Sequence, residues 1–201
     1  MFTNDLGIRI TQWFSLKDKE GDGEFVGPTL LLPYYVTMPT SDQSTLLYTT
    51  KPVMLMSRIE REDLSGVAGI IGNGVLPSES DVDGLLRLCR GRRLVFLGDL
   101  DPVDYLIFCW LRCQLTNIDA SYLGISDLFL GRLDVTLSRC SVQSLGQSES
   151  DSLIEFADVF AELSQISGAT CHQLIMDGKK VELEAVLRSD HLVEAIRQSL
   201  C

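Results

Sequence analysis

The stretch Leu94-Val-Phe-Leu-Gly-Asp-Leu-Asp-Pro-Val-Asp-Tyr105 decides the fold. Leu94 to Leu97 form a short apolar run, which is typical of a strand buried on both faces. Gly98 then lets the backbone turn, because it has no Cβ. Asp101-Pro102-Val103-Asp104 is a good helix start, with Asp as the N-cap and Pro at the first helical position. The stretch therefore predicts a buried strand, a turn with two aspartates, and a helix.

The turn presents Asp99 and Asp101 at the carboxyl end of the predicted strand. Ligands of open α/β sheets gather at the carboxyl ends of the strands, and carboxylate oxygens suit a hard cation such as Mg²⁺. We therefore expect Asp99 and Asp101 to be metal ligands. A second interpretation stays open, in which Asp101 is only a helix cap, but capping gives no reason for Asp99.

The segments on either side repeat the strand and helix pattern. Gly66 to Gly72 reads as a small apolar strand, and a helix with apolar positions from Val82 to Cys89 follows it. A helix over residues 103–114 follows the central strand, and Ala120 to Ser126 reads as a third strand. Strands that alternate with helices favour a parallel sheet. We expect an α/β domain over residues 58–201, with a mainly parallel sheet flanked by helices, in which the first two strands form a parallel pair.

The remaining segments carry weaker signals. Residues 1–57 read as a small β-rich N-terminal segment. Its expected strands are Gly7–Trp13, Thr29–Pro33, Leu46–Thr50 and Val53–Met56. Towards the C-terminus we expect a polar linker at Gln143–Ser152, a helix opened by Ser152, an extended piece at His172–Ile175, and an amphipathic helix after Ser189.

Composition excludes several classes of protein. The formal net charge of −11 and the pI near 4.5 argue against nucleic-acid binding by bulk electrostatics, which needs Lys and Arg to neutralise phosphates. The 6 cysteines form no C-x-x-C pair, and with only 2 histidines a zinc site is not expected. No signal peptide is visible, and no apolar run reaches the roughly 20 residues of a membrane span. The simplest expected location is the cytoplasm, without membrane contact.

Gly98-Asp99-Leu100-Asp101-Pro102, followed by Tyr122-Leu-Gly-Ile-Ser126, resembles the Toprim domain. It is most similar to the branch that contains the topoisomerase VI A subunit and the nuclease subunit of the Wadjet anti-plasmid system. The resemblance covers roughly residues 65–200, and Lys180 to Leu187 is loosely similar to the Glu-rich helix near the end of those domains. It implies that Asp99 and Asp101 hold Mg²⁺, which stabilises charge on a cleaved phosphodiester, and that a Glu after the first strand acts in acid–base catalysis.

The expected Glu is missing. The first strand ends in Ile70-Ile-Gly-Asn-Gly74, so Gly72 or Asn73 stands at that position. Asn73 can offer an amide oxygen to a cation but cannot accept a proton at neutral pH. Glu79 is either a substitute that folds back or a solvated residue at a helix start. We therefore expect a divalent-metal-binding, Toprim-like domain, associated with nucleic-acid phosphodiester chemistry and catalytically impaired, which reaches nucleic acid through the metal or a partner protein.

Two alternatives stay open. The first is a non-catalytic interaction module whose acidic surface docks a protein partner. The second is a Mg²⁺-dependent phosphatase of the haloacid-dehalogenase type, since Asp99-Leu-Asp-Pro-Val103 fits its D-x-D motif. That fold needs a later Lys, for which Lys179 and Lys180 are the candidates. It also needs a downstream acidic pair, and no acidic pair in this sequence follows a convincing strand.

Overall fold

A computed structural model describes residues 3–20, 35–37, 44–59, 64, 68–72, 76–77 and 79–200, with the backbone alone for residues 17–20, 35–37, 79 and 80. Five strands form the main sheet in the order β1-β3-β2-β4-β5. They are β1 Tyr35–Thr37, β2 Thr45–Thr49, β3 Ala68–Gly72, β4 Arg93–Leu97 and β5 Ala120–Tyr122. Neighbouring strands from β3 to β5 are parallel, and β1 is antiparallel to β3. The predicted α/β class with a mainly parallel sheet is confirmed.

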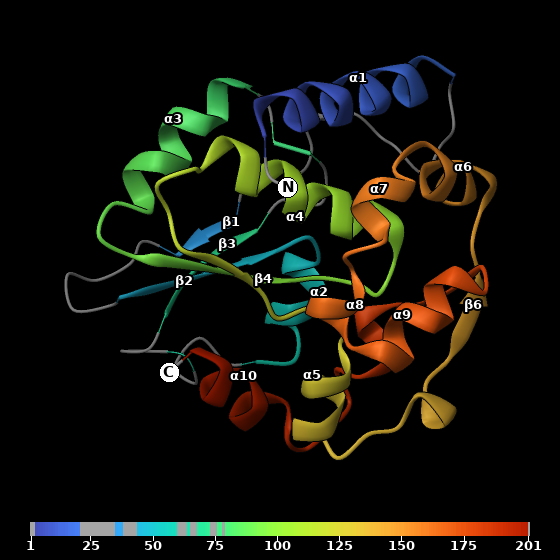
Figure 1. The fold of residues 1–201 in the computed structure, drawn as a ribbon. Coiled ribbons are helices and arrows are strands. Elements are labelled where there is room, and N and C mark those ends of the chain that lie inside the picture. Colours follow the sequence, from blue (N-terminus) through green and yellow to red (C-terminus); the bar gives the residue numbers. More distant parts are fainter. Residues whose placement is uncertain are drawn as a thin grey trace.

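Helices cover both faces of this sheet, as Figure 1 shows: α1, α3 and α4 lie on one side, and α2, α5 and α10 on the other. Their bounds are α1 Asn4–Glu20, α2 Pro52–Met56, α3 Glu79–Leu88, α4 Pro102–Gln114, α5 Asp127–Arg132 and α10 Leu192–Leu200. A small antiparallel sheet pairs β6 Val142–Ser144 with β7 Lys179–Val181. The chain between these two strands forms α6 Gln147–Glu155, α7 Ala157–Phe160, α8 Ser164–Ser167 and α9 Ala169–Met176.

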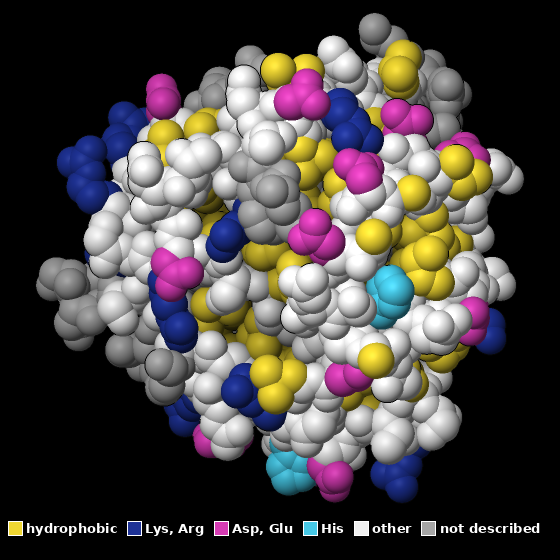
Figure 2. Space-filling view, viewed as in Figure 1, with side chains coloured by type: hydrophobic (Ala, Val, Ile, Leu, Met, Phe, Trp, Pro, Cys, Tyr) yellow, Lys and Arg dark blue, Asp and Glu magenta, His cyan; other side chains and the backbone are white. Residues whose placement is uncertain are grey.

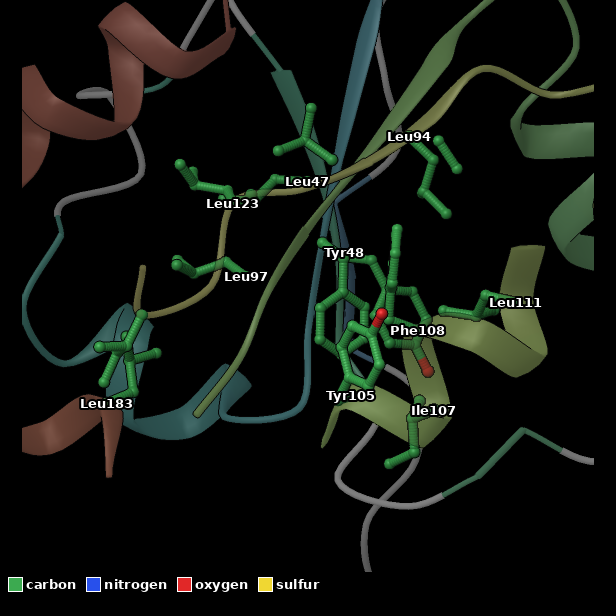
Figure 3. Close-up of a cluster of buried hydrophobic side chains, with 14 of the residues drawn as sticks. Leu47, Tyr48, Leu94, Leu97, Tyr105, Ile107, Phe108, Leu111, Leu123 and Leu183 are labelled. Atoms are coloured by element: carbon green, nitrogen blue, oxygen red, sulfur yellow. The ribbon is translucent and has the colours of Figure 1, made fainter. Parts of the chain in front are cut away.

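The central strands β2 and β4 are buried on both faces. On the side of α4, the ring of Phe96 stacks between those of Tyr48, at 5.6 Å, and Tyr122, at 5.7 Å. Figure 3 shows Tyr48, Tyr105 and Phe108 gathered between the sheet and α4, with Leu97 on the opposite face. Because β4 is packed from both sides, the turn that follows it starts from a rigid position.

The predicted starts of two helices are confirmed. Asp101 is the N-cap of α4, where its side chain accepts a hydrogen bond from the backbone N–H of Asp104, and Pro102 follows at the first helical position. Ser126 caps α5 in the same way, accepting from the N–H of Phe129. In both places the capping residue lies four residues after the end of a strand, so it sets where the next helix begins.

The β-rich character expected of residues 1–57 is wrong in two of its four stretches. Gly7–Trp13 lies inside α1, because Leu6, Ile10 and Trp13 share a helical spacing and are buried, whereas Ile8 is exposed. Val53–Met56 belongs to α2, which Pro52 begins. The strand expected at Leu46–Thr50 is confirmed as β2, and Thr29–Pro33 lies outside the described residues.

β2 occupies a place that the sequence pattern did not indicate. The predicted strands β3 and β4 are parallel but do not pair directly, because β2 lies between them. Thr49, the last residue of β2, stands beside Leu97, the last residue of β4. The main sheet therefore crosses the boundary suggested at residue 57.

Three expectations beyond residue 126 are also wrong. The stretch expected to be a linker contributes β6 and most of α6, which therefore begins well before Ser152. Glu149 accounts for that start, because its carboxylate accepts a hydrogen bond from the N–H of Gly146. His172–Ile175 lies within α9, where Cys171 and Ile175 are buried at helical spacing. The last predicted helix is confirmed as α10.

Two structural features concern the expected compartment: the state of the cysteines and the length and apolarity of the helices. The five described cysteines are free, and four of them are buried. Among the described residues, no helix combines the length and the apolarity that a membrane span requires.

Candidate functional site

Asp99 follows β4 at the carboxyl end of the parallel strands, where the sequence predicted it, and only 3% of its surface is exposed. Its Oδ1 accepts a hydrogen bond from the backbone N–H of Leu183 at 2.7 Å. Its Oδ2 lies 3.0 Å from Nζ of Lys51. The hydroxyl of Tyr122 donates to the backbone oxygen of Asp99 at 2.8 Å, so both the carboxylate and the backbone of this residue are held.

Asp101 and Asp104 lie next to it and are also buried. Asp101 Oδ1 accepts from the N–H of Asp104 at 2.7 Å, so the capping interpretation holds for this oxygen. Asp104 Oδ2 accepts from the N–H of Asp99 and from the hydroxyl of Thr50, both at 2.6 Å. Sequence reasoning gave Asp104 only a role at the helix start, although it ties the turn after β4 to the end of β2.

Lys51 is one of the residues at this site that the sequence did not indicate. Its ammonium lies 2.7 Å from a carboxylate oxygen of Glu182, 3.0 Å from Asp99 and 3.5 Å from Glu184. Because β2 and β4 are neighbouring parallel strands in register, the residues after their last pair leave the same end of the sheet. Lys51 is thus brought to Asp99 by strand order, which no local pattern signals.

Glu182 and Glu184 arrive from the C-terminal part of the chain. The turn residue Leu100 pairs with Val181 of β7 through two backbone hydrogen bonds of 2.9 and 3.1 Å. Glu182 follows directly, and a 3₁₀ turn at Leu183–Ala185 carries Glu184. The stretch whose resemblance implied a Glu-rich helix thus forms a strand and a tight turn. We call Asp99, Asp101, Asp104, Glu182 and Glu184 the acidic centre.

The side chains of the acidic centre shift one another's pKa values. Burial, together with the nearby Asp101, raises the pKa of Asp99 well above its usual range, although Lys51 opposes this. Burial and the charge of Asp99 raise the pKa of Asp104 to about 7. Burial would also raise the pKa of Glu182, but the hydrogen bond from Lys51 and further interactions outweigh it and lower that pKa to about 2. Burial would lower the pKa of Lys51, yet Asp99 and Glu182 raise it.

We expect the Asp104→Asn variant to lose one component of the pH dependence of stability. The pKa of Asp104 is about 7 in the folded protein and 3.8 as the ordinary value, so between these pH values the folded state binds more protons. Stability therefore falls as pH rises through this window, by at most about 1.4 kcal/mol per pH unit. Asparagine keeps an acceptor oxygen for Thr50 and Asp99, so the decline between pH 4 and 7 should be shallower in the variant.

Urea denaturation at several pH values between about 4 and 7 measures this difference. The control is Asp158→Asn at the surface, since Arg9 lowers the pKa of Asp158, and a lowered carboxyl pKa does not make stability fall as pH rises. Equal slopes for wild type and Asp104→Asn would contradict the expectation.

Of the positions expected to supply the third group, the structure fully describes only Gly72. Gly72 ends β3, which β2 separates from β4, and Asn73 lies outside the described residues. Glu79 is the first residue of α3, and only its backbone is described. The residue that meets Asp99 from the neighbouring strand is Lys51.

The donor atoms of the acidic centre suit a hard cation. Two sets of three carboxylates, Asp99 with Asp101 and Asp104, and Asp99 with Glu182 and Glu184, each bring one oxygen per residue within 4.8 Å of the others. Oε2 of Glu184 is buried, and no described residue forms a hydrogen bond with it. However, the ammonium of Lys51 already contacts all three residues of the second set. The ammonium of Lys51 therefore already lies among the carboxylates of this set.

Comparisons add no relative. Neither a protein-family model nor a curated protein matches this sequence. Any assignment of function therefore has to come from the residues and geometry of the acidic centre.

Proposed function

We propose that this chain is a Toprim-like domain of a nucleic-acid-associated assembly, and that it does not cleave phosphodiester bonds itself. One observation carries the proposal: the strand beside Asp99 is followed by Thr50 and Lys51, and not by a carboxylate. In the domains that the chain resembles, a Glu after the first strand acts in acid–base catalysis. Along this chain the first strand of the parallel set is β2, so its end takes the place that the sequence analysis gave to Gly72 and Asn73.

The chemistry of Lys51 supports this loss of activity. A general base has to accept a proton at the working pH. Asp99 and Glu182 raise the pKa of Lys51, so its ammonium stays protonated and offers no lone pair. Asp104 is buried, and one of its oxygens is committed to the N–H of Asp99 and the hydroxyl of Thr50.

Mg²⁺ remains a proposal for this site. Asp99, Glu182 and Glu184 would hold the ion, and a bound Mg²⁺ would stabilise negative charge on a phosphodiester. The three carboxylates would have to give up their contacts with Lys51 for this. The proposed role of the chain is therefore to bind and to hold a position within the assembly, and not to cleave nucleic acid.

The two alternatives receive less support. A phosphatase of the haloacid-dehalogenase type needs a nucleophilic aspartate with a free oxygen, whereas the two oxygens of Asp99 contact Leu183 and Lys51. A module that docks its partner through an acidic surface needs a continuous acidic patch. On the face drawn in Figure 2, the described Asp and Glu side chains are scattered among other residues.

The proposal is tested by incubating the protein with supercoiled plasmid and with single-stranded DNA and RNA, in Mg²⁺ and in Mn²⁺. We expect wild type and Asp99→Ala to give the same background of nicking and strand cleavage. Metal-dependent cleavage by wild type that disappears in Asp99→Ala would refute the proposed loss of activity.

The association with nucleic acid needs a separate measurement. We expect complexes that contain the native chain, isolated from its source cells, to hold nucleic acid that nuclease treatment releases. The purified chain alone should not bind DNA at physiological salt, because its net charge is −11. Complexes free of nucleic acid would refute this part of the proposal.

A further inference from the structure

The ammonium of Lys51 lies where the carboxylates of the acidic centre converge. Glu182, Asp99 and Glu184 each place an oxygen 2.7 to 3.5 Å from Nζ. An ammonium carries three N–H donors, and three carboxylates surround this one. Lys51 therefore stands where these residues would bind a free cation.

We infer that Lys51 is a built-in cation, which closes the Asp99–Glu182–Glu184 set to divalent metal and thereby sets the metal affinity of that set. The inference rests on the proposed function in one respect, since both concern the same carboxylates. The inference can be tested independently of whether the chain associates with nucleic acid.

An ammonium and a metal ion cannot occupy this set together. Mg²⁺ binds carboxylate oxygens at about 2.0–2.1 Å, and oxygens that already lie 2.7 and 3.0 Å from Nζ would bring the two cations into close contact. The repulsion between like charges is strong where water is largely excluded, and Asp99 is almost completely buried. Binding of the metal therefore requires the ammonium to leave.

Lys51 has a route by which it can leave. Its side chain is 27% exposed, whereas that of Asp99 is 4% exposed, so the lysine reaches the centre from the solvent side. Its backbone is anchored, because its N–H donates to the hydroxyl of Thr49 and it precedes α2. A rotation of the side chain alone would open the carboxylates, so metal and lysine compete in a reversible equilibrium.

The orphaned oxygen of Glu184 indicates that the site has spare capacity for a cation. Oε1 of Glu184 is the most distant of the three contacts of Lys51, at 3.5 Å, and Oε2 is buried without a hydrogen bond from any described residue. A buried carboxylate oxygen without a partner is costly. A divalent ion in place of the ammonium would give this carboxylate a closer partner.

Calorimetric titration of Mg²⁺ and Mn²⁺ tests the inference in four proteins: wild type, Lys51→Met, Lys51→Met with Asp99→Asn, and Lys179→Met. Methionine keeps the length of the side chain and removes its charge. Lys179 is an exposed residue of β7, and no described ion pair links it to the acidic centre. Its variant therefore controls for the change in net charge. The metal alone is the probe.

We expect Lys51→Met to bind the metal at least tenfold more tightly than wild type and Lys179→Met do. Adding Asp99→Asn should remove this gain. Equal affinities of wild type and Lys51→Met would overturn the inference. The absence of binding in both would also overturn it, because there would then be no metal site for Lys51 to close. Neither result bears on the loss of cleavage activity, which the nuclease assay decides separately.

A second variant keeps the test decisive if Lys51→Met does not fold. Lys51→Gln removes the charge but keeps N–H donors for the carboxylates. We expect millimolar Mg²⁺ to raise the melting temperature of this variant and to leave that of wild type unchanged. The same melting temperature with and without metal in Lys51→Gln would overturn the inference.

Discussion

Lys51→Met should lower the free energy of unfolding by about 3 kcal/mol at neutral pH in a buffer that contains a chelator. The reason is that Asp99 is buried and Glu182 is half-buried, and both lose the ammonium that lies within 3.0 Å of their oxygens. Breaking a buried ion pair by removing one partner is strongly destabilising. Asp99, whose pKa burial already raises, must then take up a proton or remain an unpaired buried charge, whereas Glu182 keeps Lys180 at 3.4 Å. Urea denaturation followed by circular dichroism measures the loss.

A double-mutant cycle separates the charge effect from the loss of packing. Asp99→Asn removes the buried charge and keeps an oxygen for the N–H of Leu183. In the Lys51→Met background this second change should therefore cost less than it does in wild type, with a coupling of about 1 kcal/mol or more. Costs that simply add would mean that Lys51 does not stabilise Asp99 through its charge.

Gly98→Ala should lower the free energy of unfolding by about 3 kcal/mol, at the upper end of the cost of overpacking. A Cβ at this position would lie 2.4 Å from Oδ2 of Asp104 and 2.7 Å from Cε1 of Phe96. Both side chains are buried, and Oδ2 of Asp104 already holds the N–H of Asp99 and the hydroxyl of Thr50. The methyl group would thus break the link between the turn and the end of β2.

Gly84→Ala is the matched control for this change. Gly84 lies within α3, and among the described residues no heavy atom other than its chain neighbours and the adjacent helix backbone lies within 4 Å of a Cβ built there. Alanine favours the helix, so this variant should be more stable than wild type by about 0.5–1 kcal/mol. If Gly98→Ala were as stable as Gly84→Ala, the turn would have room that the structure does not show.

Local signals accounted for what the sequence predicted correctly. The strand that ends at Leu97, the cap at Asp101 and the proline after it are all encoded within ten residues, and each is confirmed. The same holds for β3 and for Ser126 as a cap. In each of these elements, propensity, burial pattern and capping favour the same structure.

Conflicting local signals account for the errors. In α1 the alternation of Ile8 and Ile10 suggests a strand, whereas the helical spacing of Leu6, Ile10 and Trp13 is the one that packs into the core. In α6 a polar composition suggested a linker, but the hydrogen bond between Glu149 and Gly146 starts a helix there. Tertiary packing decided α1, whereas a local cap decided α6.

The acidic centre was predictable only in part, because strand order is a long-range property. Asp99 and Asp101 lie where the turn pattern placed them. Lys51 and Glu182 are 131 residues apart, and nothing near either of them marks it as a partner of the other. Their meeting depends on β2 lying between β3 and β4, and on Leu100 pairing with Val181.

The separation of 131 residues between Lys51 and Glu182 also sets the order in which the protein can assemble. During synthesis, β2 and β4 can pair once residue 97 has left the ribosome, whereas the carboxylates of Glu182 and Glu184 arrive much later. Contacts between residues so far apart in the sequence carry a large cost in loop-closure entropy, and they slow folding. Until they form, Lys51 can pair with Asp99, but the acidic centre still lacks two of its five carboxylates.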